Sequence, residues 1–209
     1  MTAPPRAGKP VVGVVGAIGA GKSVVCRRLA DLGARVLDAD RTGHETLRLP
    51  AVRDALVEKF GAQILDGQGG VDRQALGRVV FADAEKRREL EAIVHPVMLE
   101  VFRKELEGAL SDETVPLVVL DAAILIEAGW DVVCDAIVFV DAPRAVRLER
   151  VQRTRGWSEE ELTRREAAQL PLEVKKKRAL AEIVNDGPVE KVHEAVDRLF
   201  AEWSTWRRA

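Results

Sequence analysis

The chain has 209 residues, of which 47% are hydrophobic and 32% are charged. A chain of this length and composition buries a core and is neither a disordered nor a collagen-like polymer. Its formal net charge of −2 and its pI of about 6.0 leave no excess of positive charge, on which non-specific nucleic-acid binding depends. We therefore expect a folded protein without a nucleic-acid partner. The sequence makes no prediction of the oligomeric state.

The two cysteines, Cys26 and Cys134, lie in separate apolar stretches and form no Cys-x-x-Cys pair. This pattern argues against structural zinc and favours a reducing, cytoplasmic location. Residues 1–9 contain prolines and no apolar run, so we predict a disordered tail there. The most apolar stretch, residues 115–128, is short and contains two acidic residues. Neither a signal peptide nor a membrane span is expected.

Short apolar runs alternate along the chain with helical periodicity. Pro10–Gly16 is an apolar, β-branched run, and the period becomes helical from Lys22 until Gly33. Similar runs that end in an acidic residue occur at residues 34–40, 115–121 and 134–141. Strands that alternate with helices pair in parallel through right-handed crossovers. We predict an α/β fold of the P-loop NTPase type, with α/β/α layers and a parallel sheet of about five strands.

A helical insertion is predicted between the second and third of these strands. Residues 47–111 show helical stretches and no convincing strand, and we expect one helix to be interrupted at His95-Pro96. The sheet and its helices would then be formed by residues 10–46, 112–146 and 181–209. Near the end of the chain, Pro188 opens an amphipathic helix that we expect to pack on the sheet.

The segment 147–180 is strongly basic. Between Arg147 and Arg178 there are ten Lys or Arg residues against six Glu. Ser158 with Glu161 three residues later forms a plausible capping box, so we expect two or three exposed helices. Most of these charges are expected to be solvated, with two or three touching a ligand. We interpret the segment as a lid that closes over an anionic ligand and excludes water.

Residues 16–23 read GAIGAGKS and match the phosphate-binding pattern G-x-x-x-x-G-K-[ST] between a predicted strand and a predicted helix. Glycines let the loop wrap with its amides pointing inward, and the helix N-terminus adds its positive dipole end. In such a loop Lys22 bridges the β- and γ-phosphates of ATP, and Ser23 ligates Mg²⁺. The alternative is a glycine-rich turn that matches by chance.

Acidic residues follow the predicted strands. Asp40 ends the second strand, where a carboxylate near the phosphate loop could orient an attacking hydroxyl, with Asp38 on the same face. A helix N-cap is the alternative role for Asp40. Asp121 ends the next strand and is a candidate Mg²⁺ carboxylate, although a turn residue is equally plausible because Asp141 ends a similar strand. Taken alone, His95 is interpreted as structural.

Two absences narrow the class of nucleotide-binding protein. The sequence contains neither the Asn-Lys-x-Asp segment with which GTPases read guanine nor the Gly-Phe-Pro-Arg segment of adenylate-kinase-like chains. The hypothesis that we favour is a P-loop kinase that uses Mg-ATP. Another small-molecule kinase of the same fold, or a regulator that binds ATP and transfers nothing, stays open at this point.

The ordered set of motifs resembles the dephospho-CoA kinase family. The phosphate loop, LDAD at Leu37–Asp40 and IVHP at Ile93–Pro96 look like the opening of that family. LDAAILIEAGW at Leu120–Trp130 and VDAPRAVRLERV at Val140–Val151 are similar to its later segments, followed by Gln169 and Asn185-Asp186-Gly187. The resemblance implies ATP-dependent phosphorylation of the ribose 3′-hydroxyl of dephospho-CoA, the last step of coenzyme A synthesis.

The resemblance also implies a role for individual residues. Asp40 would be the base and Lys22 the phosphate-binding catalytic residue. The insertion would bind dephospho-CoA, with Asp40, His95 and Glu127 on the acceptor side. Ser23 and Asp121 are the metal candidates. The implied ATP site consists of Gly16, Ala17, Ile18, Gly19, Ala20, Gly21, Lys22, Ser23, Val24, Arg150 and Asn185.

The sequence departs from the family pattern at several positions in the phosphate loop and in and after the lid. Ala17 and Ala20 stand where the family commonly has Gly and Ser. Both residues are small, so we expect an intact loop. Thr154 stands where an Arg is usual in the lid, and Arg153 or Arg155 could take its place.

Overall fold

The computed structural model describes residues 8–80 and 83–206, so the tail predicted over residues 1–9 lies, up to residue 7, outside the described residues. The chain divides into two compact units, Met1–Asp38 with Gly108–Ala209, and Ala39–Glu107. The first contains the sheet, and the second is helical.

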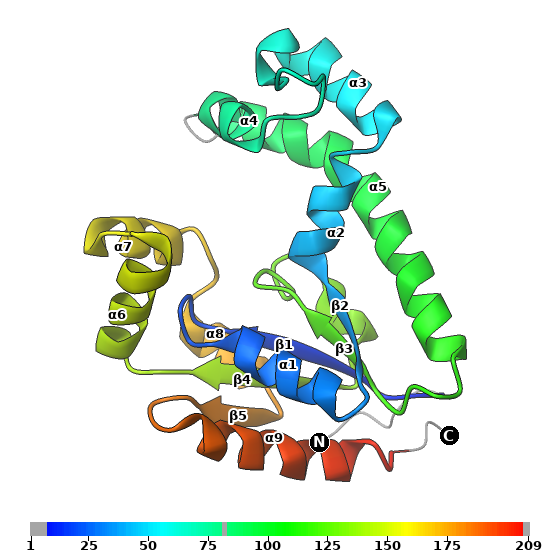
Figure 1. Cartoon of the computed structure of the whole chain (residues 1–209), viewed down its shortest axis with the longest axis vertical. Coiled ribbons are helices and arrows are strands. Elements are labelled where there is room, and N and C mark those ends of the chain that lie inside the picture. The colour runs from blue at the N-terminus through cyan, green and yellow to red at the C-terminus, as the bar shows by residue number, and fades with distance from the viewer. Residues whose placement is uncertain (1–7, 81–82, 207–209) are drawn as a thin grey trace. The chain divides into compact units, whose positions relative to one another are not determined.

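The first unit is built on a five-stranded parallel sheet in the order β2-β3-β1-β4-β5 (Figure 1). The predicted α/β class with about five parallel strands is confirmed. All six residues of the central strand β1 are buried, as expected for a parallel strand covered on both faces. The strands are β1 (Val11–Gly16), β2 (Arg35–Asp38), β3 (Val118–Asp121), β4 (Ala136–Asp141) and β5 (Ala181–Val184).

Both faces of this sheet are covered. On one face, Val12 and Val14 belong to a core shared with α1 (Lys22–Asp31) and α9 (Val189–Trp203), which run side by side in Figure 1. Between these valines, Gly13 faces the opposite side, where a Cβ would meet Leu125 and Cys134. The predicted closing helix therefore packs on the sheet, and α1 ends before Gly33, whose φ is +98°.

The basic segment forms the three helices α6 (Arg144–Arg155), α7 (Glu159–Ala167) and α8 (Leu172–Arg178). Ser158 is the N-cap of α7, and its hydroxyl accepts a hydrogen bond from the backbone N–H of Glu161 at 3.2 Å. The predicted cap is confirmed. A short 3-10 helix, Trp130–Val133, precedes β4.

The second unit has its own apolar core. Its elements are α2 (Ala39–Thr46), α3 (Pro50–Phe60), a 3-10 helix (Ala62–Ile64), α4 (Arg73–Val80) and most of α5 (Ala84–Ser111). The predicted insertion is therefore helical in the structure. Side chains from these elements pack together. The buried members of this core are Val52, Leu56, Phe60, Ile64, Leu76, Val80 and Val94.

The expected interruption at His95-Pro96 is wrong, because α5 continues through Pro96 as one helix. An internal proline removes one backbone hydrogen bond and crowds the preceding turn. Val94 and Phe102, on either side of the proline, are both buried. Their packing offsets that local cost, which a pattern of residue types cannot reveal.

The placement of Asp40 at the end of a strand is also wrong. β2 ends at Asp38, and Asp40 is the second residue of α2. The buried residues of this helix are Ala39, Thr42 and Thr46. Their spacing is helical, but alanine and threonine give a weak apolar signal, so the strand was extended too far. Asp38 and Asp40 consequently do not share one strand face.

Candidate active site

The phosphate loop connects the end of β1 to the first turn of α1 in a conformation that requires glycine. Gly19 has a φ of +78° and Gly21, the N-cap of α1, a φ of +95°. Residues with a Cβ rarely adopt these angles. A Cβ on Gly21 would also lie 2.2 Å from Nδ2 of Asn185. Backbone conformation and the lack of space both account for this glycine.

The loop also lies tightly against the sheet. A Cβ on Gly16 would come within 2.3 Å of the carbonyl oxygen of Val140 in β4. The next residue, Ala17, donates its backbone N–H to that same oxygen. Ala17 and Ala20 are both buried. Small side chains at these positions therefore fit the loop, as the sequence predicts.

Side chains from α6 and from the residue after β5 hold two carbonyl groups of the loop. The Ala20 carbonyl accepts hydrogen bonds from Asn185 Nδ2 at 2.8 Å and Arg150 Nη1 at 3.3 Å. The Ile18 carbonyl accepts one from Arg147 Nη1 at 3.2 Å. In a trans peptide the N–H points opposite to the C=O. These contacts therefore direct the next N–H groups, those of Gly19 and Gly21, away from the guanidinium and amide donors.

Lys22 and Asp121 form an ion pair at the carboxyl end of the sheet, with Nζ 3.3 Å from Oδ1. Asp121 is in register with Val14 of β1 and Asp38 of β2. The thiol of Cys26 donates a hydrogen bond to the same carboxylate. Burial and the negative charge of Asp121 raise the pKa of this thiol, which keeps it protonated.

The candidate metal ligands offer hard oxygen donors. Ser23 lies in the first turn of α1 with an exposed side chain, and Asp121 contributes a carboxylate. Mg²⁺ commonly takes one or two protein oxygens and completes its shell with phosphate and water oxygens. The two residues fit that donor set. Within residues 8–80 and 83–206, no group of three or more His, Cys, Asp or Glu is arranged to hold a metal ion.

Three further predicted site residues come from parts of the chain other than the phosphate loop. Asp40 in α2 and His95 in α5 belong to the helical unit, where both are exposed. Glu127, in the sheet unit, accepts through Oε1 from Lys175 Nζ at 2.8 Å and from the backbone N–H of Leu170 at 3.0 Å. The acceptor-side role of all three stays a prediction.

Two basic residues of the segment whose charges were expected to be mostly solvated are buried. Arg147 is 5% exposed and Lys175 is 0% exposed. Arg147 lies four residues before the buried Val151, on the inner face of α6. Lys175 lies three residues after Leu172, which packs on the core. This spacing is the signal that could have separated them from their exposed neighbours.

A parallel sheet whose first strand runs into a glycine loop and a Lys-Ser helix start places the protein in the P-loop NTPase fold class. The fold is similar to that of the Acinetobacter baumannii shikimate kinase, with a TM-score of 0.53 at 19% identity over 93% of this chain and 94% of that one. The Campylobacter jejuni dephospho-CoA kinase is more alike in fold, with a TM-score of 0.64 at 23% identity, covering 93% and 97% of the two chains.

The particular family follows from sequence. The family model described as dephospho-CoA kinase matches residues 10–191. A dephospho-CoA kinase of Parasynechococcus marenigrum is 41% identical over 198 residues, which cover 93% of this chain and 98% of the relative. The Thermus thermophilus structure TT1252 is 35% identical, with a TM-score of 0.81 and coverage of 93% and 98%. The chain belongs to the dephospho-CoA kinase family.

The protein is thus a kinase, and the family resemblance drawn from its motifs is confirmed. Among the residues that the structure describes, none of the helices combines the length and apolar character needed to cross a bilayer.

Proposed function

We propose that the chain binds Mg-ATP at Gly16–Ser23 and transfers the γ-phosphoryl group to the ribose 3′-hydroxyl of dephospho-CoA, giving coenzyme A and ADP. The observation that carries this proposal is the phosphate loop, whose two positive-φ glycines and restrained carbonyls leave backbone N–H groups for an anion. Family membership supports the acceptor. Because Cys26 and Cys134 are not joined in a disulfide bond, we further propose a cytoplasmic location.

Lys22 and Ser23 serve the phosphates in this proposal. Lys22 exchanges its contact with Asp121 for the β- and γ-phosphate oxygens, since its side chain is one-fifth exposed. Ser23 and Asp121 hold Mg²⁺, directly or through water. When bound, the ion neutralises charge that develops on the transferring group. The backbone N–H groups of Ile18, Gly19 and Gly21 complete the loop side of the ATP site. Ala17, Ala20 and Val24 line that site, but their own N–H groups donate to carbonyl groups of the protein.

On the acceptor side, Asp40 accepts the proton of the attacking hydroxyl and orients the oxygen toward the γ-phosphorus. Its exposed carboxylate follows β2 by two residues. The helical segment that the sequence placed at residues 47–111 binds the rest of dephospho-CoA, with His95 and Glu127 as the candidate contacts. Residues 147–180 form the lid, and Arg150 and Asn185 lie close to bound ATP because both contact the loop carbonyl of Ala20.

The assay that tests transfer measures ADP with Mg-ATP, in the presence and absence of dephospho-CoA. Strict dependence of ADP formation on the acceptor is expected. Equal rates without acceptor would contradict the kinase proposal and favour a regulator or a hydrolase. A product phosphorylated at a hydroxyl other than the 3′ position would contradict the stated regiochemistry.

Asp40→Asn tests the base. We expect turnover to fall roughly 10²-fold or more, with ATP affinity retained, because a positioned base supplies an effect of that size. Glu45→Gln, which changes an exposed carboxylate of the same helix outside the proposed acceptor-binding segment, is the matched control and should keep wild-type turnover. Unchanged turnover in Asp40→Asn would remove Asp40 from the reaction.

A further inference from the structure

A fully buried lysine lies outside the phosphate loop. Lys175 of α8 has an exposed fraction of 0%, and lysine is almost never fully buried unless its charge is paired. Its Nζ donates to the Ala123 carbonyl at 2.8 Å, to Glu127 Oε1 at 2.8 Å and to Gln169 Oε1 at 3.1 Å. An ammonium group has three donors, so these three partners satisfy all of them.

These contacts join the stretch after β3 to α8 and to the connector that precedes α8. Ala123 and Glu127 lie after β3, in the stretch that begins next to Asp121. Gln169 lies in the connector between α7 and α8. Glu127 Oε1 also accepts the backbone N–H of Leu170 at 3.0 Å. Lys175 thus holds the connector through the side chain of Gln169, and Glu127 holds it through the backbone N–H of Leu170.

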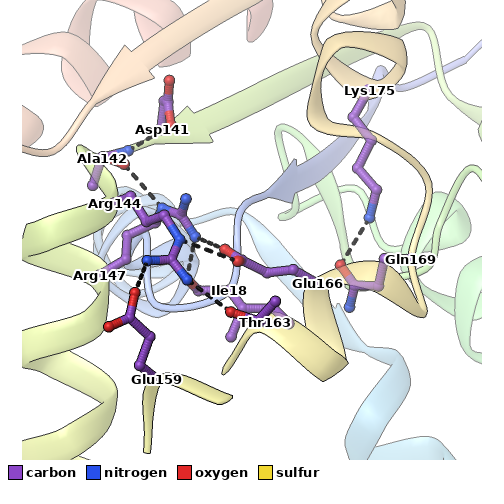
Figure 2. A network of polar contacts seen from close by, with 10 residues as sticks. All are labelled: Ile18, Asp141, Ala142, Arg144, Arg147, Glu159, Thr163, Glu166, Gln169 and Lys175. Carbon is purple, nitrogen blue, oxygen red and sulfur yellow. Dashed lines mark hydrogen bonds and ion pairs between the residues drawn. The ribbon is translucent and has the colours of Figure 1, made fainter. Parts of the chain in front are cut away.

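The end of α7, which precedes this connector, is linked to the phosphate loop through Arg147. Glu166, near the end of α7, pairs with Arg147, and its second oxygen lies 3.6 Å from Nε of Arg144. Arg147 in turn donates to the Ile18 carbonyl. Figure 2 shows Glu166 beside the two arginines, and Gln169 meeting Lys175 farther along the same segment. Contacts at Glu166 and at Gln169 therefore hold the end of α7 and the connector that follows it.

We propose that Lys175 is a positioning residue for phosphoryl transfer. It anchors the end of α7, so that Glu166 keeps Arg147 on the loop carbonyl and the lid stays in place over the phosphates. The proposal rests on ATP binding at the loop. Loss of the anchor lets water reach the γ-phosphate, so that ADP forms without transfer to the acceptor.

The test compares Lys175→Met with the double variant Lys175→Met/Glu127→Met. Removing one member of a buried ion pair strongly destabilises a fold, whereas replacing both members with apolar residues is often neutral. We expect the melting temperature to fall in the single variant and largely recover in the double variant. The acceptor phosphorylated per ADP formed is measured at saturating dephospho-CoA, so that a weaker acceptor contact at Glu127 does not lower it. This ratio should fall about threefold or more in both variants, because neither retains the anchor.

A merely structural role would lower the amount of folded enzyme and leave this ratio unchanged. A ratio equal to that of the wild type in the double variant would therefore overturn the proposal. Lys176→Met is the matched control, since it removes an exposed lysine of the same helix that pairs with Glu182. It should leave the ratio unchanged.

Gln169→Leu keeps the test decisive if the lysine variants fail to fold. It removes one acceptor of Lys175 while preserving the ion pair with Glu127. A lower ratio supports the anchor, and an unchanged ratio overturns it. Failure of the proposed function gives a different result, in which wild-type ADP formation does not depend on the acceptor.

Discussion

Lys22 of the phosphate loop is paired with Asp121 at the end of β3, with 3.3 Å between Nζ and Oδ1. Both side chains are about one-fifth exposed, so neither bears the desolvation cost of a fully buried pair. The pair keeps the lysine at the loop while leaving it able to exchange partners. Its carboxylate also accepts a hydrogen bond from Cys26, one turn into α1.

Asp121→Asn separates a metal carboxylate from a structural residue. We expect the Mg²⁺ concentration for half-maximal activity to rise roughly tenfold, because a neutral amide is a poorer ligand for a hard cation. Steady-state kinetics across a Mg²⁺ titration measure the change. Asp141→Asn is the control, because Asp141 also ends a strand but accepts from the N–H of Ala142. An equal shift in both variants would contradict the metal role.

Gly21→Ala should abolish ATP binding. The substitution places a Cβ at a φ of +95° and 2.2 Å from Asn185 Nδ2. Gly69→Ala has a comparable φ of +78° but no atom within 4 Å of the new Cβ. It should therefore cost only about 1 kcal/mol of stability for the backbone strain. Denaturant unfolding and nucleotide titration distinguish Gly21→Ala from Gly69→Ala. Equal losses of stability in the two variants would show that the contact with Asn185 adds nothing to the backbone strain.

The thiol of Cys26 should resist alkylation in the folded protein. Burial, followed by the charge of Asp121, raises its pKa, and the reactive thiolate is therefore scarce at neutral pH. Cys134 is only partly buried and should react first. Mass spectrometry of peptides after maleimide treatment gives the order. Labelling of Cys26 at the rate seen in urea would show that its burial does not protect it.

The sequence predicted the parts of the molecule that depend on local pattern. The phosphate loop could be recognised because Gly16–Ser23 combines a motif with a change from strand to helix periodicity. Asp40 was misplaced because the buried face of its helix is made of Ala39, Thr42 and Thr46, which resemble a loop or strand end in composition. Pro96 was misread because packing at Val94 and Phe102 outweighs its local preference.

Side-chain partners from distant segments could not be predicted. The spacing from Leu172 could mark Lys175 as facing inward, but no local pattern identifies the partners that leave it fully buried while Lys176 is 44% exposed. The difference comes from Glu127 and Ala123, about fifty residues earlier in the chain. The same holds for Arg147, whose acceptor at Ile18 lies 129 residues away. Such contacts depend on the tertiary fold, and short motifs do not predict them.

The link between α1 and α9 should make stability depend on pH. Arg28 donates Nε and Nη2 to the two carboxylate oxygens of Asp197, each at 2.7 Å, and this hydrogen bonding lowers the pKa of Asp197. A lowered pKa contributes stability above the ordinary aspartate value of about 3.9, and the contribution is lost as pH falls through the folded-state pKa.

Asp197→Asn should therefore melt below the wild type at pH 7, and the gap should close as the pH is lowered below about 4. The gap is expected to be modest, because the pair is partly solvated and salt-screened. Thermal unfolding from pH 3 to 7 measures it. Glu194→Gln removes an exposed carboxylate from the same helix and should show little gap at any pH. A gap that widens in acid would contradict the assignment of the stabilising charge to Asp197.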